Sequence, residues 1–257
     1  IFFSVAIRYI TGRSLRVDGE THVEEEISHS NEVLEDKKTL VYDKSLYADS
    51  PGFFYSFIKR LFDIVLSLVG IIVLIIPMAV ICIIIALGDG GSPIYSHKRV
   101  GKNGKKSYIY KFRSMIVNAG NVEELLNEEQ LEQYHREFKV NDDPRITRFG
   151  NFLRKTSIDE IPQLFNILTG DLSFIGPRPI MEEELLTNYT PEEIAKFLSV
   201  TPGLSGYWQA FARNDAEYDD GARQNMEIFY IEHQSLCLDI RIFFKTIVSV
   251  IKGSGVK

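Results

Sequence analysis

Hydrophobic and polar residues divide this chain into stretches of different character. Residues 1–10 are apolar but too short to cross a bilayer, and residues 11–50 are polar and acidic with few large apolar side chains. An amphipathic stretch then begins at Phe53 and leads into an uncharged apolar run from Ile64 to Leu87. A helix over this run would be about 36 Å long, which exceeds the roughly 30 Å of bilayer hydrocarbon.

Two paths are open for this apolar helix. One is an ordinary transmembrane span, with the segments before and after it on opposite sides. The other is a re-entrant helix that bends at Pro77, where proline removes a backbone hydrogen bond, and returns to its starting side. Basic residues flank both ends, at 59–60 and at 98–106, so the positive-inside rule is satisfied only if both ends are cytoplasmic. We therefore favour the re-entrant path.

This interpretation divides the chain into three parts. They are an N-terminal segment or linker, a membrane segment that bends at Pro77, and a cytosolic domain, at 1–52, 53–88 and 89–257. Because the sequence does not begin with Met, we also expect further sequence upstream of residue 1.

A β-hairpin is predicted after the membrane segment. Apolar and polar residues alternate in Ile94–Val100 and again in Ser107–Phe112, on either side of a Gly-x-x-Gly turn. The second strand brings Lys111 to its end with Arg113 just beyond, and a spacing of two places their side chains on the same face. These cations form either part of a phosphate site or a solvated, headgroup-binding surface.

Most of the remaining chain has helical patterns. Residues 117–140 are acidic and helix-forming, and Thr190–Pro191 is a helix-start signal. The last helix carries apolar residues on one face, which suits either an interfacial helix or one packed on the core: Ile240, Phe243, Phe244, Ile247 and Ile251. The predicted fold class is thus α+β and mainly helical, with a short β-hairpin and interfacial amphipathic helices.

Charge distribution narrows the kinds of partner. The formal net charge of -6 disfavours nucleic acid as the main partner. Residues 1–50 carry ten acidic and six basic residues, whereas residues 59–113 carry nine basic and two acidic ones. That basic block favours lipid headgroups or phosphate substrates. The two cysteines lack the spacing of a disulfide framework, so we expect the protein in a reducing compartment. The five histidines lack the spacing of a zinc site.

Acidic and basic groups converge between residues 154 and 179. The adjacent carboxylates Asp159 and Glu160 lie between Arg154 and the arginine of Gly-Pro-Arg-Pro, Arg178. Ser157 and Glu160 also have the capping-box spacing, so Glu160 has a purely structural interpretation as a helix cap. A helix start is, however, also a good phosphate site.

This combination suits phosphoryl transfer. Arginine, lysine and Mg²⁺ stabilise the charge that develops on phosphate oxygens. One carboxylate can bind Mg²⁺ together with the substrate, and the other can act as a nucleophile that divides the transfer into two displacements. Neighbouring positions on a helix point about 100° apart, so we expect a division of labour between them.

Four motifs together resemble the bacterial sugar transferases known as monotopic phosphoglycosyl transferases. They are K-F-R-S-M at 111–115, D-P-R-I-T-R-F-G at 143–150, R-K-T-S-I-D-E through G-P-R-P at 154–179, and P-G-L-S-G-Y-W-Q at 202–209. The resemblance runs from about residue 53 to the C-terminus. It implies a re-entrant membrane helix broken at a proline and a small catalytic domain on the cytoplasmic face of the bacterial inner membrane.

The resemblance also implies an activity and a set of site residues. Such enzymes take a sugar phosphate from a UDP-sugar, release UMP and pass the sugar phosphate to undecaprenyl phosphate, the first membrane step of capsule, exopolysaccharide or O-antigen synthesis. By this likeness Asp159 is the nucleophile and Glu160 helps to bind Mg²⁺. The substrate is then held by cationic residues: Lys111, Arg113, Arg154, Arg178 and Arg213.

Other functions and several details stay open at this point. A membrane-bound scaffold that binds anionic lipid or an export partner, without catalysis, is the main alternative, and a lipid phosphatase or pyrophosphatase is a third. Trp208 and Gln209 suit either base recognition or packing. The sugar depends on contacts in residues 201–225, and the oligomeric state, a homodimer included, is not determined by the sequence.

Overall fold

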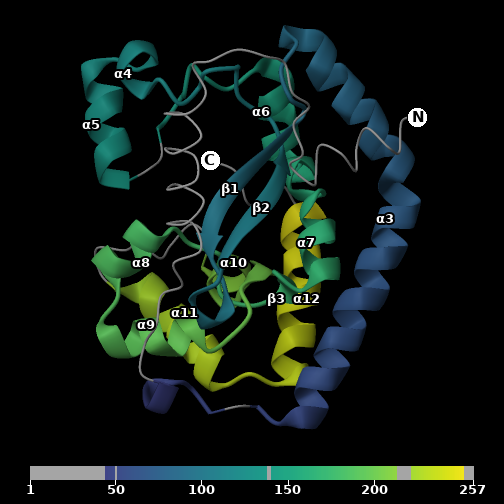
Figure 1. Ribbon diagram of the computed structural model, residues 1–257, viewed down its shortest axis with the longest axis vertical. Coiled ribbons are helices and arrows are strands. Elements are labelled where there is room, and N and C mark those ends of the chain that lie inside the picture. Colours follow the sequence, from purple (N-terminus) through teal and green to yellow (C-terminus); the bar gives the residue numbers. More distant parts are fainter. Residues whose placement is uncertain (1–43, 50, 138–139, 213–220, 252–257) are drawn as a thin grey trace, which may run out of the picture. The chain divides into compact units, whose positions relative to one another are not determined.

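Helix α3 (Phe53–Asp89) runs along one side of the folded chain for 37 residues (Figure 1). The computed structural model describes residues 44–49, 51–137, 140–212 and 221–251. These residues belong to one compact unit, Thr39–Lys257. The expected N-terminal segment lies largely outside the described residues.

The membrane candidate predicted from the sequence is part of α3. This helix is long and apolar enough to cross a bilayer, and few of its most apolar residues are buried. Pro77 lies inside the helix without ending it, and the ribbon bends along its length (Figure 1). The path through a membrane, spanning or re-entrant, stays a prediction.

The first turns of α3 carry a polar face that binds the rest of the chain. Lys59 Nζ lies 2.6 Å from the carboxylate of Asp239, and Tyr55 donates a hydrogen bond of 2.8 Å to the same carboxylate. Tyr230 donates a third hydrogen bond, 2.7 Å long, to Asp239. Lys59 is therefore the partner of a largely buried carboxylate and not an exposed flanking charge.

The next turn of α3 continues this polar face. The guanidinium of Arg60 donates to the carbonyls of Ile167 and Leu168 at 2.6 and 2.7 Å, at the carboxyl end of α7 (Gln163–Thr169). A cation at that end of a helix also interacts favourably with its dipole. Asp63 is buried and accepts the backbone N–H of Phe174 at 2.9 Å. The start of α3 is thus fixed to the folded unit by charged groups.

The predicted hairpin is confirmed. Strands β1 (Ile94–Val100) and β2 (Lys106–Phe112) pair antiparallel, with Ile94 opposite Phe112 and Val100 opposite Lys106. A short turn, η2 (Lys102–Gly104), joins them, with Asn103 at a φ of 58°. The alternation of apolar and polar residues therefore predicted the bounds of both strands to within one residue.

The mainly helical composition is also confirmed (Figure 1). Besides α3 and α7, the described helices are η1 (Lys44–Leu46), α4 (Val122–Leu125), α5 (Glu128–Glu137), α6 (Arg148–Lys155), η3 (Ile158–Glu160), α8 (Glu182–Asn188), α9 (Pro191–Leu198), α10 (Tyr207–Phe211), α11 (Ala222–Glu232) and α12 (Leu236–Ile251). Helix α9 begins where Thr190–Pro191 predicted, because Thr190 and Glu193 form a capping box.

Two short parallel strands support the Gly-Pro-Arg-Pro loop. Strand β3 (Ser173–Ile175) pairs with β4 (Gly203–Ser205). A Cβ atom on Gly203 would lie 2.1 Å from the backbone nitrogen of Gly176, so neither position has room for a side chain. The loop that carries Arg178 is thereby held directly against the loop that precedes β4.

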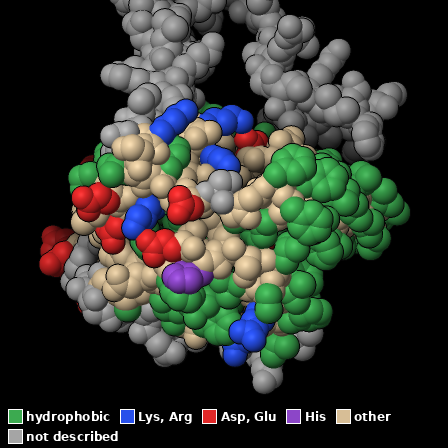
Figure 2. Space-filling view, turned by 90° about the horizontal axis from the view of Figure 1, so that it is seen from below, with side chains coloured by type: hydrophobic (Ala, Val, Ile, Leu, Met, Phe, Trp, Pro, Cys, Tyr) green, Lys and Arg blue, Asp and Glu red, His purple; other side chains and the backbone are tan. Residues whose placement is uncertain are grey.

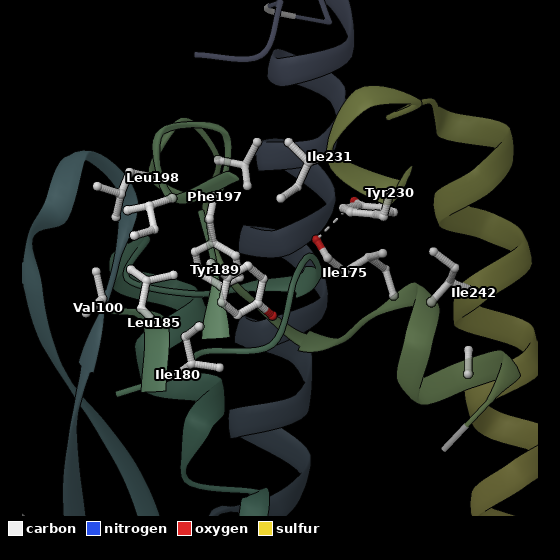
Figure 3. Packing of buried hydrophobic residues seen from close by; sticks show 13 residues of the cluster. Val100, Ile175, Ile180, Leu185, Tyr189, Phe197, Leu198, Tyr230, Ile231 and Ile242 are labelled. Carbon is white, nitrogen blue, oxygen red and sulfur yellow. Dashed lines mark hydrogen bonds between the residues drawn. The ribbon is translucent and has the colours of Figure 1, made fainter. Parts of the chain in front are cut away.

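The largest cluster of buried apolar residues joins the carboxyl half of the chain. It includes Leu185 of α8, Leu198 of α9, Tyr230 of α11 and Ile242 of α12 (Figure 3). Helix α12 packs on this core through Ile242, whereas Phe244 is 62% exposed. One face of α12 is thus a core face, and its use at a membrane interface stays a prediction.

Candidate active site

Helix α6 crosses the end of β2 at very short distance. Its N-cap is Thr147, whose hydroxyl accepts the N–H of Gly150 at 2.8 Å. A Cβ atom on Gly150 would lie 1.9 Å from the carbonyl oxygen of Ser114, so a larger residue cannot be accommodated here. The crossing allows Arg154, in the last turn of α6, to donate from Nε to the hydroxyl of Ser114 at 2.8 Å. Arg154 is thus fixed beside the strand that carries Lys111.

The turn η3 presents the two adjacent carboxylates. Ser157 leaves α6 in the left-handed region, with a φ of 55°, and makes no side-chain cap. The predicted capping box of Ser157 and Glu160 is therefore wrong, because only a short 3-10 turn follows and the Glu160 side chain bonds to Lys111 instead. The Ser-x-x-Glu pattern at 157–160 instead corresponds to a tight turn, which places Asp159 and Glu160 at the end of the hairpin.

Lys111 lies between the two carboxylates. Its Nζ is 2.7 Å from Oε1 of Glu160 and 3.8 Å from Oδ2 of Asp159. The structure therefore brings together four of the predicted site residues, from β2, α6 and η3. This arrangement favours the site interpretation of Lys111 over a solvated basic surface.

Asp159 is a buried carboxylate with two cationic side chains nearby. Asp159 is 8% exposed. Burial raises the pKa of Asp159, and the adjacent Glu160 adds to the rise, whereas Lys111 and Arg154 lower it. Burial also lowers the pKa of Arg154, which the charge of Asp159 partly opposes. A carboxylate held this way is poorly solvated and has cations positioned next to it.

The carboxylates also fit the prediction that a divalent cation binds here. Mg²⁺ is held in proteins by one or two carboxylates together with substrate phosphates and water. Asp159 and Glu160 supply two carboxylates, and the ammonium of Lys111 already lies within 4 Å of both. Among the described residues no group of three or more acidic, histidine or cysteine side chains is placed to hold a metal ion, and Mg²⁺ binding stays a prediction.

Arg113 takes a different position from Lys111. Its guanidinium pairs with Asp89 in the last turn of α3, and it packs against the backbone of Gly91. The backbone N–H of Val117 also donates to Asp89, at 3.3 Å. In this structure Arg113 joins the hairpin to the end of α3, and its role as a substrate ligand stays a prediction.

Arg178 is held in its loop by two kinds of contact. Its backbone N–H donates to the carboxylate of Glu227 at 3.2 Å. Its guanidinium lies 5.9 Å from the ring centre of Trp208, which Arg223 covers more closely at 4.2 Å. Trp208 is 8% exposed, so packing with two arginines is its observed role. Arg213 lies outside the described residues.

Two charged residues of this region were missed by the sequence interpretation. Glu227 is 1% exposed and Arg223 is 7% exposed, on the face of α11 that also buries Tyr230 and Ile231. Burial raises the pKa of Glu227 to about 7, although the Arg178 N–H and the nearby arginines lower it. The sequence feature that could have identified them is a pair of charged residues, four positions apart, on the apolar face of a helix.

A protein-family model matches most of this chain. Residues 54–253 match the family model described as bacterial sugar transferase. The match includes α3, the hairpin, the η3 turn and the Gly-Pro-Arg-Pro loop, so every described residue of the site lies within it.

Curated relatives match the same region. The UDP-galactose-lipid carrier transferase of Erwinia amylovora is 45% identical over 202 residues, and the undecaprenyl-phosphate galactose phosphotransferase of Salmonella typhimurium is 43% identical over 202 residues. Each match covers 77% of this chain but 41% of the relative. The chain therefore spans about two fifths of the length of these two proteins.

A shorter relative is matched over most of its length. The exopolysaccharide production protein ExoY of Sinorhizobium fredii is 38% identical over 200 residues, which cover 77% of this chain and 87% of the relative. Together with the family model, this match shows that the chain belongs to the bacterial sugar transferase family.

Proposed function

We propose that this protein transfers a sugar phosphate from a UDP-sugar to undecaprenyl phosphate and releases UMP. The reaction would be the first membrane step in the synthesis of a capsule, exopolysaccharide or O-antigen, on the cytoplasmic face of the bacterial inner membrane. The observation that carries the proposal is the buried Asp159 with Lys111 and Arg154 beside it, in a chain of the sugar transferase family. The names of the relatives support a polyprenyl phosphate acceptor and a galactose or related donor.

The first displacement begins with Asp159 as a carboxylate. One of its oxygens attacks the phosphorus that bears the sugar, and the bond from that phosphorus to the bridging oxygen breaks. UMP leaves with the oxygen that joined the two phosphorus atoms, and an acyl phosphate of Asp159 that carries the sugar remains. Lys111 and Arg154 lie where they can stabilise the charge on the transferring phosphoryl group.

The second displacement restores the enzyme. A phosphate oxygen of the lipid attacks the same phosphorus, the bond to Asp159 breaks, and a lipid-linked sugar diphosphate forms.

Glu160 would hold Mg²⁺ with the diphosphate of the donor, and the metal would neutralise charge on the phosphate oxygens. Arg178, Arg113 and Arg213 are proposed as further phosphate or nucleotide ligands.

An Asp159→Asn variant tests the nucleophile directly. The purified protein, reconstituted in lipid nanodiscs, is supplied with Mg²⁺ and a panel of UDP-sugars, and UMP release is measured. The amide cannot form the acyl phosphate, so UMP release should fall by a factor on the order of 10³ or more, and the covalent adduct should be absent by intact-mass analysis. Glu232→Gln is the matched control, because it removes an exposed carboxylate of α11.

The products also separate the alternative functions. A non-catalytic scaffold yields no UMP with any sugar, and a lipid phosphatase yields free phosphate without UMP. Normal turnover by Asp159→Asn would exclude the covalent route through this residue.

A further inference from the structure

A mostly apolar cavity of about 360 Å³ adjoins the carboxylates of η3. It is bounded by α3, the turn from Thr156 to Ile161, α7, the two short parallel strands, α10 and α12. Its walls are formed largely by leucine, isoleucine and phenylalanine side chains, among them Leu74, Leu164, Leu204 and Phe243. Its volume and lining are those of a small-molecule site.

The charge of this cavity disfavours the nucleotide donor as its occupant. Among the described residues that line it, Glu160 is the one charged side chain and no lysine or arginine contributes. A nucleoside diphosphate needs cations, and Lys111 and Arg154 do not line the cavity. The walls therefore suit a neutral apolar chain whose charged end lies outside the cavity, near Glu160.

The position of the cavity joins the reacting carboxylates to the apolar outer surface. Its lining includes Glu160, the residue next to Asp159. Its walls also include Leu74 of α3, whose neighbour Val73 is 66% exposed, and Ile247 of α12, which is 39% exposed. Figure 2 shows hydrophobic side chains gathered on the side of the molecule where α3 lies. An apolar chain can thus reach the cavity from a lipid phase.

We propose that this cavity binds the first prenyl units of the acceptor lipid, next to its phosphate. This inference rests on the proposed function, because it names where the acceptor of that reaction lies. Burial of each methylene group contributes about 0.8 kcal/mol, so filling the cavity supplies acceptor affinity that does not depend on the phosphate. It also fixes the phosphate near Glu160 and Asp159.

Two cavity-filling variants and two matched controls test the proposal. Ile247→Trp and Leu74→Trp add bulk to the lining contributed by α12 and α3, and Val248→Trp and Val73→Trp introduce the same side chain at exposed positions on the same helices. The cavity variants should raise the KM for undecaprenyl phosphate about tenfold, the loss expected from about two methylene groups. The UMP burst without acceptor should stay within about twofold, and both controls should match the unchanged protein.

The outcomes separate this proposal from the proposed function. An equal loss of the UMP burst and of transfer would overturn it by assigning the cavity to the donor, and an unchanged KM in both cavity variants would overturn it as well. If the unchanged protein released no UMP, the proposed function would fail instead.

Photolabelling tests the position of the prenyl chain directly and does not require turnover. A photoreactive prenyl phosphate should label β4 or α12, and Ile247→Trp should reduce this labelling. Labelling that is confined to residues outside the cavity lining, or that Ile247→Trp leaves unchanged, would contradict the cavity assignment.

Discussion

At the scale of single residues, Glu227 is a buried carboxyl group that positions an arginine loop. It is fully enclosed and accepts the backbone N–H of Arg178 at 3.2 Å. Burial raises the pKa of Glu227 to about 7, from 4.5. Because the folded state holds this proton more tightly than the unfolded state, the stability it contributes is present in full below pH 4.5 and is lost as the pH rises through about 7.

Replacement of Glu227 by glutamine should therefore change the pH dependence of stability. The unchanged protein should lose stability between about pH 4.5 and pH 7, by up to about 3 kcal/mol from this group, because the carboxylate must ionise in a buried site. The amide cannot ionise and still offers an oxygen to the Arg178 N–H, so the variant should have a flatter profile. Thermal unfolding in detergent at each pH measures the difference.

Glu232→Gln provides the control for this measurement. It makes the same change on the same helix, at a side chain that is 40% exposed. Its pH profile should follow that of the unchanged protein. Equal slopes for Glu227→Gln and Glu232→Gln would show that Glu227 does not titrate in this range.

At the scale of elements, α3 is held to the folded unit by a buried ion pair. Lys59 and Asp239 lie 2.6 Å apart with side chains 16% and 11% exposed, and Tyr55 and Tyr230 donate to the same carboxylate. Removing one member of such a network leaves the others buried and unpaired, which costs about 3–5 kcal/mol. The contact thus fixes the start of α3 against α11 and α12.

An exposed ion pair of the same length provides the comparison. Lys196 and Glu232 are also 2.6 Å apart but 33% and 40% exposed. Asp239→Ala should lower the unfolding free energy by roughly 3 kcal/mol, and Glu232→Ala by less than about 1 kcal/mol. Thermal unfolding in nanodiscs tests both. A small effect of Asp239→Ala, similar to that of Glu232→Ala, would show that the network does not anchor α3.

Local sequence patterns predicted the helices and strands better than the contacts between residues that are far apart in the sequence. Alternation identified both strands of the hairpin because the signal lies within each strand. The roles of Lys59 and Glu227 were not predicted, because the partner of Lys59 is 180 residues away and that of Glu227 is 49 residues away. Likewise, Ser-x-x-Glu at residue 157 specified a turn, but the bond of Glu160 to Lys111 depends on how the hairpin packs.

At the scale of the whole molecule, both ends of α3 contact the same folded unit. Near its start, Lys59 pairs with Asp239, and in its last turn Asp89 pairs with Arg113 (Figure 1). Both partners belong to the unit Thr39–Lys257. A helix of 37 residues is about 55 Å long, against roughly 30 Å of bilayer hydrocarbon. A straight span would place the two contacts on opposite sides of that layer and break one of them.

The two contacts therefore predict that α3 enters and leaves the membrane on one side. Single cysteines at Ser56 and Gly88 mark exposed positions near its two ends, in a background that lacks Cys82 and Cys237. Gly88 has open space around it, so a cysteine fits there. In sealed inverted vesicles, a membrane-impermeant maleimide should label both positions from the outside.

Topology controls complete this experiment. In intact spheroplasts neither position should react, and a cysteine at Val80, in the apolar run just after Pro77, should stay unlabelled in both preparations because lipid should surround it. Labelling of Ser56 and Gly88 from opposite sides would establish a spanning helix and would require that the Lys59–Asp239 or the Asp89–Arg113 contact opens in the membrane. Labelling from one side would be consistent with the proposed reaction, in which a soluble nucleotide-sugar and a lipid phosphate would both have to reach Asp159 at the membrane surface.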